Sequence, residues 1–407
     1  LAARAGRPLV LRRAVVRDPA KPRAVPLPPE LVTTDLRAVL DDPSIDVAVE
    51  LVGGVEWARR AVLGLLAANK DVVTANKALL AQHGAEVFDT ARRYGRTVAF
   101  EASVAGGIPI VAALAQSLAA NQIVALQGIL NGTCNFILTA MSEKGQGYAE
   151  ALAEAQRRGY AEADPTLDVD GSDAAHKLAI LAQLAFGLTV PVGAIEKRGI
   201  AGLHEMDIRF ARELGYTIKL LAEAWLDPQT RQLALHVSPV LLRHQAPLAQ
   251  VRGAYNAVSV VGDAVGDTLY YGRGAGQMPT ASAVVADLID LAVGRAQLTF
   301  RTLRLWSGNG GGIGLRPAAA VRSRFYLRLL VEDRPGVLAD VARLLANQHI
   351  SISSVIQHEA LDEQEGGTVP LVIMTHTAAT GDFRAAVAEI DRMASVAGPG
   401  VHYPVAD

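Results

Sequence analysis

The sequence contains very little cysteine and no surplus of charge of either sign. A single cysteine, Cys134, excludes an intramolecular disulfide framework and fits a reducing cytosol, so we expect a cytoplasmic protein. The formal net charge is −2, and no basic stripe or acidic tail indicates a nucleic-acid partner. No apolar run reaches the ~18 residues that a membrane span needs, so we expect no membrane partner. Small molecules are therefore the expected ligands.

The composition is that of a globular chain long enough for two or three domains, with 50% hydrophobic and 20% charged residues. Over residues 1–103, β-rich runs alternate with helix-like segments, and this alternation predicts an α/β domain with a parallel sheet. The strands are expected at 8–16, 47–53, 71–76 and 97–103. The turns that follow three of them, at 53–54, 75–77 and 105–107, should line one crevice at the carboxyl edge of the sheet.

The rest of the chain divides into three parts. Residues 104–305 show long helices with only a few strands, which indicates a mixed α+β substrate domain. Residues 306–322 are glycine-rich and predict a linker or loop. Residues 323–407 read as strand, helix, strand, strand, helix, with a weak last strand near 401–405, which is the ferredoxin-like order.

An acidic loop precedes the apolar helix expected near 173–186. It contains five carboxylates within twelve residues: Glu162, Asp164, Asp168, Asp170 and Asp173. A calcium loop needs glycine at the sixth position and glutamate at the twelfth, and counting from Asp168 these positions hold Asp173 and Ala179. The carboxylates are better suited to a cleft that receives a cation, so Glu162, Asp164 and Asp168 are expected to hold a substrate ammonium group.

Asp173 and Lys177 lie four residues apart, on one face of that helix. On spacing alone an ordinary ion pair is the better interpretation. However, the neighbouring positions are almost all apolar, and buried charges must be paired or used. A lysine in a partly dry, acid-lined pocket is suited to acid/base catalysis.

Three other features are candidates for a functional role. Lys77 directly follows a strand, where it could contact a cofactor or substrate, or could be a solvent-exposed residue at a helix start. Cys134 could be a nucleophile, but no histidine is marked by spacing as its base, so a packed core thiol is favoured. The glycine loop at 271–276 could cradle a phosphate at a helix start.

Five motifs in a fixed order carry a resemblance to a known family. They are VTANKALLA, FEASVAGGIPI, LNGTCNFILT, GYAEADPTLDVDGSDAAHKLAIL and YGRGAGQMPTASAVVADL. Together they resemble homoserine dehydrogenase over essentially the whole chain, and the turn EDRPGVLA resembles the ACT regulatory domain of the monofunctional bacterial form. The resemblance implies a Rossmann-type nucleotide-binding domain over 1–103, a substrate and dimerisation domain over 104–305, a linker over 306–322 and an ACT domain over 323–407.

The resemblance implies a reaction and roles for individual residues. The reaction is the reversible reduction of L-aspartate 4-semialdehyde to L-homoserine with NAD(P)H, on the route to threonine, isoleucine and methionine. Lys177 matches the catalytic lysine that gives a proton to the aldehyde oxygen, and Asp173 matches its partner. Glu162 matches the residue that binds the substrate amino group. Asp168 matches a further substrate-site carboxylate, Lys77 matches the lysine between cofactor and substrate, and Gly159 matches a glycine that contacts the cofactor. Gly53 lies in the crevice expected to bind the cofactor.

Cofactor preference is expected to depend on the end of the first strand. There Arg17 precedes Asp18, and a basic residue favours the extra phosphate of NADP, with Lys21 as a possible helper. The resembled family begins with a strand and a GxGxxG turn whose amides hold the pyrophosphate. This chain begins at Leu1, without a methionine and without that turn, so we expect that an N-terminal piece has been lost.

The resemblance also implies a cation, an effector and an oligomer. A structural sodium or similar cation is expected at Glu101 and at the main-chain carbonyls near Val104, Gly106 and Ile108, a donor set suited to a hard cation. The ACT domain implies an amino-acid effector, with threonine expected. Such domains usually pair edge to edge, so a homodimer or homotetramer is expected.

Two rival interpretations follow from the same features. An ACT-linked dehydrogenase of another substrate, such as an aromatic one, would want an arginine-rich, aromatic-lined pocket, whereas the candidate loop here is acidic. A catalytically silent amino-acid-sensing ACT protein is favoured by the missing glycine turn and opposed by the intact Lys177 and Asp173.

Overall fold

The computed structural model describes residues 2–307, 312–358 and 367–406. The chain forms two compact units, each assembled from separate stretches of sequence. Unit 1 consists of residues 1–123, 176–194 and 262–313, and unit 2 consists of residues 124–175, 195–261 and 314–407. Within the described part of the chain, no helix combines the length and the apolar character that a membrane span requires.

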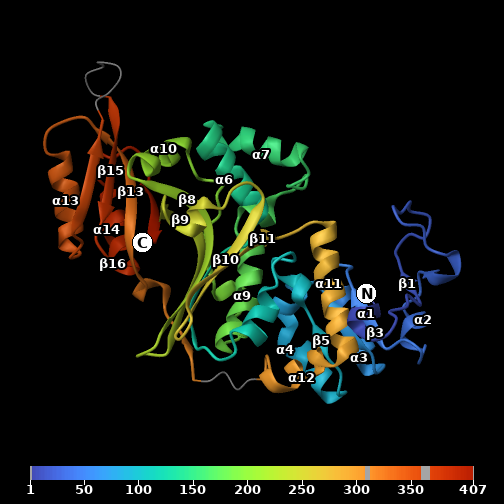
Figure 1. The fold of residues 1–407 in the computed structure, drawn as a ribbon. Helices are drawn as coiled ribbons and strands as arrows, with labels where there is room; N and C mark the ends of the chain where they lie inside the picture. Colours follow the sequence, from blue (N-terminus) through green and yellow to red (C-terminus); the bar gives the residue numbers. More distant parts are fainter. Residues whose placement is uncertain (1, 308–311, 359–366, 407) are drawn as a thin grey trace. The chain divides into compact units, whose positions relative to one another are not determined.

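Unit 1 contains a parallel three-stranded sheet in the order β3 (Val47–Glu50), β4 (Asp71–Thr74), β5 (Val98–Ala99). The helices α3 (Glu56–Ala67) and α4 (Lys77–Arg93) connect these strands (Figure 1). Helix α3 buries Ala58, Ala61, Val62, Leu65 and Leu66. This spacing is that of one helix face, and burial of that face against the sheet stabilises the helix.

The opposite face of this sheet is covered by α11 (Gln277–Val293). Val73 and Ala99 of the sheet pack against Val284 and Leu291 of α11. Side chains alternate along a strand, so the fully buried Val72 points to the other face. The expected parallel sheet with helices on both faces is therefore confirmed, although its last helix comes from residues far along the chain.

The first strand is much shorter than expected. Only β1 (Ala14–Val15) forms within the range 8–16, and it pairs with β2 (Val32–Thr33) in a separate two-stranded parallel sheet. The apolar residues before it are exposed, with Val10 at 66% and Leu11 at 55% of their full accessibility. The apolar run therefore has no buried face that could extend the strand.

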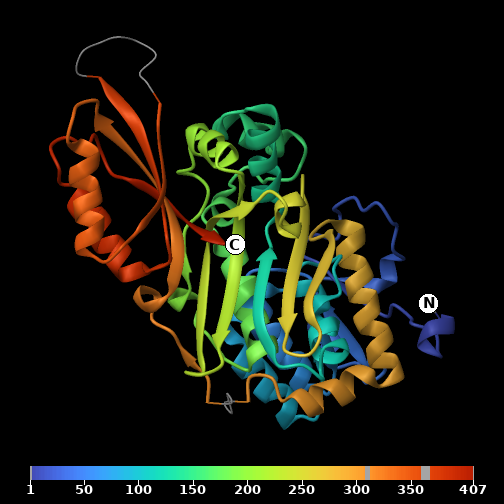
Figure 2. The ribbon, with the colours of Figure 1, turned by 60° about the vertical axis from the view of Figure 1, so that its left-hand side comes forward.

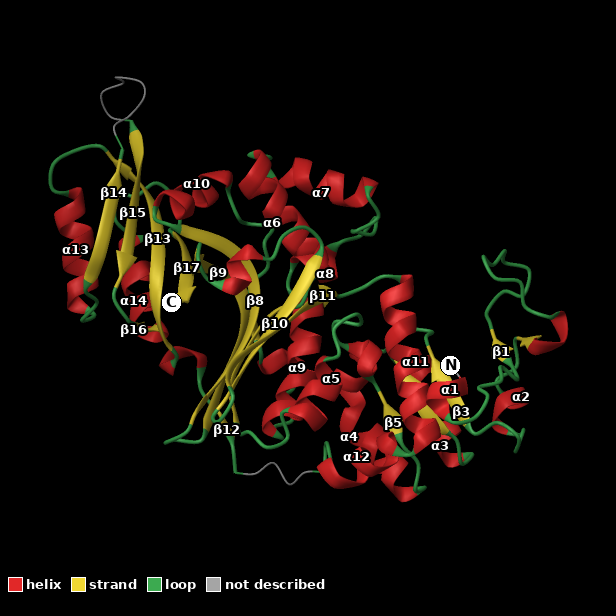
Figure 3. Ribbon diagram, in the orientation of Figure 1, coloured by secondary structure: helices red, strands yellow, loops and turns green. Residues whose placement is uncertain are grey.

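A long sheet dominates unit 2. Residues 104–305 contain the strands β6 to β11, which are more than the few that the sequence predicts. Within this unit the order is β10, β6, β8, β9, β17, β13, β15, β14. Figure 3 labels these strands, apart from β6. Strands β8 (Tyr216–Asp227) and β9 (Gln232–Arg243) form an antiparallel hairpin. Almost every residue of β8 is buried, so the apolar–polar alternation that identifies a half-exposed strand is absent from its sequence.

The C-terminal part of unit 2 has the expected ferredoxin-like order. Strands β17, β13, β15 and β14 are antiparallel neighbours, and α13 and α14 share one core with the sheet (Figure 2). Gly336, in the turn before α13, has a φ of 94°, a left-handed conformation that glycine adopts without strain. The bounds are β13 (Arg322–Glu332), α13 (Val337–Asn347), β14 (Ile352–Gln357), β15 (Thr368–Thr375), α14 (Thr380–Ile390) and β17 (Val401–Ala406).

Strand pairing and a buried ion pair are among the contacts that join the ferredoxin-like part to the rest of unit 2. Strand β17 pairs in parallel with β9, through Val405 opposite Leu241. The fully buried Asp207 of α10 (Glu205–Glu213) binds the guanidinium of Arg328 at 2.6 Å and the hydroxyl of Tyr326 at 3.0 Å. Breaking a buried pair of this kind costs about 3–5 kcal/mol, so it fixes α10 to β13.

The expected linker is only partly irregular. Residues 308–311 lie outside the described residues, while Gly314–Leu315 forms β12, which pairs with β9.

The remaining α-helices and strands are α1 (Ala2–Ala5), α2 (Arg37–Leu40), α5 (Ile110–Ala112), β6 (Ile123–Ile129), α6 (Gly132–Lys144), α7 (Tyr148–Arg157), α8 (Thr166–Val169), α9 (Ser172–Phe186), β7 (Glu196–Lys197), β10 (Tyr255–Gly262), β11 (Gly266–Arg273), α12 (Arg295–Leu303) and β16 (Ala378–Ala379).

Candidate functional site

Unit 1 contains a pocket of about 550 Å³ at the carboxyl ends of β3 and β4. This volume is within the range of small-molecule and cofactor sites. Its lining residues come from the β3 and β4 turns and from the start of α11: Glu50, Leu51, Gly53, Ala75, Asn76, Gly276, Gln277, Thr280, Ala281, Val284 and Val285. The position at the carboxyl edge of a parallel sheet is where α/β proteins bind ligands.

Two buried polar side chains, Glu50 and Asn76, fix the turns of this pocket. Glu50 accepts hydrogen bonds from the amides of Val52 and Gly53 and from the hydroxyl of Thr74. Asn76 caps α4 by accepting from the amide of Leu79, and its Nδ2 donates to the carbonyl of Gly54 at 2.7 Å. The β3 and β4 turns are therefore held together before any ligand binds.

Glycine is needed in the β3 turn. Gly53 and Gly54 have φ values of 75° and 69°, and a Cβ at either residue would meet no atom within 4 Å. The left-handed backbone conformation, and not contact with neighbouring atoms, therefore explains why glycine is needed here. Without a side chain, the backbone is open to a ligand. Gly53 lies in the pocket as expected, and Lys77 begins α4 directly after the β4 turn.

The third predicted turn, at 105–107, braces the pocket instead of lining it. The amides of Gly106 and Gly107 donate to the carbonyls of Gly274 and Arg273 at 2.9 Å. A Cβ at Gly107 would lie 2.3 Å from the Arg273 carbonyl oxygen, so only glycine fits. The expectation that all three turns line one crevice was therefore wrong for this turn, which anchors the loop before α11.

In unit 2 the acidic loop and the start of α9 meet at Asn131, which the sequence interpretation missed. Its Nδ2 donates to Asp168 Oδ1 at 2.7 Å and to Asp173 Oδ2 at 2.9 Å, while its Oδ1 caps α6 through the amide of Cys134. Two of the predicted site carboxylates are thus held on one amide group. The only signal in the sequence was an asparagine at a helix start, which by itself indicates a cap.

Asp173 and Lys177 lie one turn apart on α9, with exposures of 6% and 8%. The helix around them is almost entirely buried and apolar, as expected, since Ala174, Ala175 and Leu178 are at most 1% exposed. Burial of two charged side chains on such a helix is costly unless both are used or compensated. This makes the pair a candidate for chemistry rather than a solvated surface ion pair.

The other carboxylates of the loop lie in different surroundings. Asp164 accepts from the amide and hydroxyl of Thr166, which lowers the pKa of its carboxyl and starts α8. Its local role is therefore that of a turn residue. Glu162 and Gly159 are exposed, and Gly159 has a φ of 74° after the end of α7. Arg17 is exposed after β1, beside Asp18, whose carboxylate accepts from the amide of Ala20.

Cys134 is fully buried in α6, and its thiol donates to the carbonyl of Asp168 at 3.2 Å. This contact fits the favoured interpretation of a packed thiol. It also ties α6 to the acidic loop a second time, next to the contacts of Asn131.

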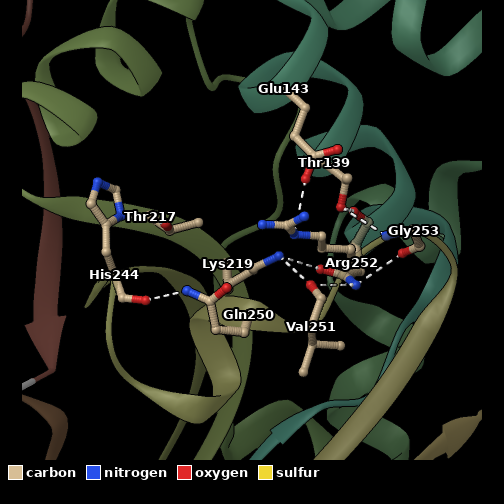
Figure 4. Close-up of polar contacts among 10 residues, drawn as sticks. Thr139, Glu143, Thr217, Lys219, His244, Gln250, Val251, Arg252 and Gly253 are labelled. Carbon is tan, nitrogen blue, oxygen red and sulfur yellow. Dashed lines mark hydrogen bonds and ion pairs between the residues drawn. The ribbon is translucent and has the colours of Figure 1, made fainter.

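A buried lysine, Lys219 of β8, lies beside Val251 (Figure 4). It also contacts Asn135 of α6, one helical turn after Asn131. Its Nζ donates to Asn135 Oδ1 at 3.0 Å and to the Val251 carbonyl at 2.5 Å. Asn135 Nδ2 donates in turn to the carbonyls of Val251, Gly253 and Tyr255. Burial lowers the pKa of Lys219 to about 8, although the charge of Glu143 acts in the opposite direction.

Lys219→Met should change how stability depends on pH. The folded pKa lies near 8 and the unfolded value near 10.4, so the unfolded state binds more protons between these limits. The contribution of Lys219 to the free energy of unfolding should thus rise by about 2 kcal/mol from pH 8 to pH 10, and this rise should be lost in the variant. Urea unfolding at both pH values measures it, and parallel curves for the two proteins would contradict it.

The predicted cation ligand Glu101 is buried, at 7% exposure. Burial raises its pKa to about 7, although its carboxylate accepts from the amides of Ala112 and Val111. Burial also raises the pKa of the neighbouring Asp287 to about 8. Among the described residues, no group of three or more His, Cys, Asp or Glu side chains is placed to hold a metal ion. Both oxygens of the Glu101 carboxylate are thus hydrogen-bonded within the chain, and the carbonyl of Ile108 accepts from the amide of Ile110 at 2.8 Å.

Sequence profiles of three families match the chain. They are homoserine dehydrogenase, NAD binding domain, over residues 1–101, homoserine dehydrogenase over 109–289, and the ACT domain over 325–394. A homoserine dehydrogenase of Pseudomonas aeruginosa is 44% identical and aligns over 100% of this chain and 93% of its own length.

Solved structures give the same result. A crystal structure of a homoserine dehydrogenase from Thiobacillus denitrificans is 44% identical, with a TM-score of 0.89 over 100% of this chain and 92% of that one. A hyperthermophilic archaeal homoserine dehydrogenase in complex with NADPH is 27% identical, with a TM-score of 0.56 over 64% of this chain and 75% of that one. Because a relative that is 44% identical spans the whole chain, this chain belongs to the homoserine dehydrogenase family, a family of oxidoreductases.

Proposed function

We propose that this oxidoreductase reversibly reduces L-aspartate 4-semialdehyde to L-homoserine with NADPH, on the route to threonine, methionine and isoleucine. The observation that carries the assignment is the joining of Asp168 and Asp173 on the amide of Asn131, at the start of the helix that bears Lys177. A buried lysine one turn beyond a fixed carboxylate cluster is suited to proton transfer at a carbonyl oxygen. The family assignment supports this choice of substrate.

Lys177 is proposed as the acid and base of the reaction. Its Nζ gives a proton to the aldehyde oxygen during reduction and accepts the hydroxyl proton of homoserine during oxidation. Asp173, one turn earlier, stabilises the protonated amine. Both side chains are at least nine-tenths buried, and exclusion of water strengthens their electrostatic interactions with the reacting group.

Carboxylates are proposed to hold the substrate ammonium group. Glu162 and Asp168 supply negative charge, and Asp168 is already oriented by Asn131 at 2.7 Å. A carboxylate that is fixed before binding loses less side-chain entropy when the substrate arrives. Lys77 is proposed to contact both the cofactor and the substrate from the start of α4.

The residues around the β3 and β4 turns fit a nicotinamide cofactor, which when bound supplies or accepts the hydride. Gly53 offers open backbone, and the N-terminus of α11 begins in the same pocket after Gly276. Such a helix start favours negatively charged groups. Gly159 is proposed as a further cofactor contact, and Arg17 as the partner of the 2′-phosphate of NADP. The NADPH complex of the archaeal relative supports this preference.

Four further assignments accompany this function as proposals. L-Threonine binds the ACT domain as a feedback inhibitor, and a sodium ion binds at Glu101 and the carbonyls near Val104, Gly106 and Ile108. The protein acts as a homodimer or homotetramer. Its single cysteine suits the cytoplasm.

The test is homoserine-dependent reduction of NADP, followed by absorbance of the reduced nicotinamide, with NAD in a parallel assay. We expect turnover with both homoserine and a nicotinamide present, a higher kcat/KM with NADP, and inhibition by L-threonine but not by D-threonine. If homoserine is not oxidised with either cofactor while L-threonine still binds, the protein is an amino-acid sensor instead. Oxidation of a different alcohol would indicate the other dehydrogenase alternative.

A further inference from the structure

A short segment of unit 2, residues 196–200, has no role in the assignments above. Its first two residues form β7, which pairs in parallel with β9, Glu196 opposite His236. The amide of Arg198 continues this pairing by donating to the Val237 carbonyl at 2.7 Å. Because side chains alternate along extended chain, Glu196 and Arg198 point to one side and Lys197 points to the other.

Glu196 and Arg198 hold the ACT domain. Glu196 forms an ion pair with Arg384 of α14. Arg198 donates to the carbonyl of His402 in β17 at 2.5 Å, and its guanidinium lies 4.7 Å from the ring centroid of Tyr403. The segment thus contacts both a helix and a strand of the ACT domain.

Lys197 holds the turn that begins α9. Its Nζ lies 2.5 Å from Asp170 Oδ2 and 2.6 Å from Ser172 Oγ. Asp170 also accepts from the amide and the hydroxyl of Ser172. Burial by itself would raise the pKa of Asp170, but the hydrogen bonds from Lys197 and Ser172 lower it below its usual value. The carboxylate is therefore kept charged in a fixed turn directly before Asp173.

The backbones of the segment and the turn are also in direct contact. The amide of Ile200 donates to the Val169 carbonyl at 2.8 Å. A Cβ at Gly199 would lie 1.9 Å from that carbonyl oxygen and 2.6 Å from Asp170 Cα, so no side chain fits between the two backbones. Packed surfaces transmit strain because they contain little free space. A displacement of the segment must therefore displace the turn.

We propose that residues 196–200 couple the ACT domain to the start of α9, and that Lys197 is a positioning residue for Asp173 and, through the helix, for Lys177. Only the predicted change in kcat for homoserine oxidation rests on the proposed function. An isolated ion pair with partners 37% and 36% exposed would contribute little. This segment differs from a surface ion pair in two respects. Its side chains make contacts on both sides of one strand, and its backbone contacts the turn at Gly199.

The first test measures kinetics with matched controls. We expect Lys197→Met to lower kcat for homoserine oxidation about tenfold, Lys197→Arg to stay within about threefold, and Arg384→Met to lower kcat about threefold. The double variant should be no worse than Lys197→Met by itself, because both changes act through one segment. The controls Lys144→Met and Arg343→Met remove other partly exposed ion pairs and should behave as wild type.

The second test does not depend on activity. Cys134 is the single cysteine and donates to the carbonyl of Asp168, on the turn that Lys197 holds. Lys197→Met should therefore raise the rate at which an aromatic disulfide reagent labels native Cys134 by about tenfold, with a smaller rise for Arg384→Met and none for the controls.

The outcomes separate the two hypotheses. Faster labelling in a protein that does not oxidise homoserine would refute the proposed function and leave the coupling intact. Wild-type kcat and wild-type labelling in Lys197→Met would overturn the coupling. The coupling would also be overturned if the reductions in kcat caused by Lys197→Met and Arg384→Met multiplied in the double variant.

Discussion

Lys177→Ala should lower kcat for homoserine oxidation by about 10³-fold. The amine is the proposed proton acceptor from the homoserine hydroxyl, and alanine offers no group that can take its place. The variant should also unfold at a lower temperature than wild type, because the buried Asp173 loses the positive charge one helical turn away. Steady-state kinetics over a range of homoserine concentrations, with calorimetry on the same samples, measures both quantities.

Two controls sharpen this expectation. Lys144→Ala removes a lysine of α6 that is paired with Glu154 of α7, and it should leave kcat within about twofold of wild type. Lys177→Arg keeps the positive charge but, with a pKa above about 12, cannot act as a base near neutral pH, so it should be nearly as inactive as Lys177→Ala. High activity in Lys177→Arg would show that the charge is needed but the proton transfer is not.

Substitution of Asn131 should have the second largest effect. Asn131→Asp places a third carboxylate within hydrogen-bond distance of Asp168 and Asp173, at an amide position 2.7 and 2.9 Å from their oxygens. Like charges at this separation repel and raise the pKa of at least one group, so the cluster loses its geometry. We expect kcat/KM for homoserine to fall by about 10²-fold or more.

A second variant separates the two functions of Asn131. Asn131→Ser keeps an oxygen that can cap α6 but lacks the donor that bridges the carboxylates, and serine is nearly as good a cap as asparagine. Its thermal midpoint should therefore stay near wild type while kcat/KM falls by about tenfold or more. If Asn131→Ser retains the wild-type kcat/KM, the bridge is only structural and the proposed cluster is not the substrate site.

The patterns that the sequence carries locally predicted their elements well. Helix α9 and its Asp173–Lys177 spacing, the ferredoxin-like order of the last domain and the glycine turns after β3 all depend on residues close together in the sequence. Periodicity, glycine conformation and helix spacing act over a few residues, so the sequence specifies them directly. The family assignment also came from the sequence, because five motifs in order are specific in combination.

Contacts between distant segments were decided by the tertiary structure. Asn131 lies 37 residues from Asp168 and 42 from Asp173, and no local pattern relates an asparagine cap to either carboxylate. Strand β8 was missed because burial on both faces removes the alternation that marks a strand. No pattern in the sequence marked Lys197. Its proposed role depends on a strand that faces the ACT domain on one side and the turn before α9 on the other. The sequence by itself therefore determined the family and named the candidate residues for chemistry, and only the packing of remote segments decided how those residues are held.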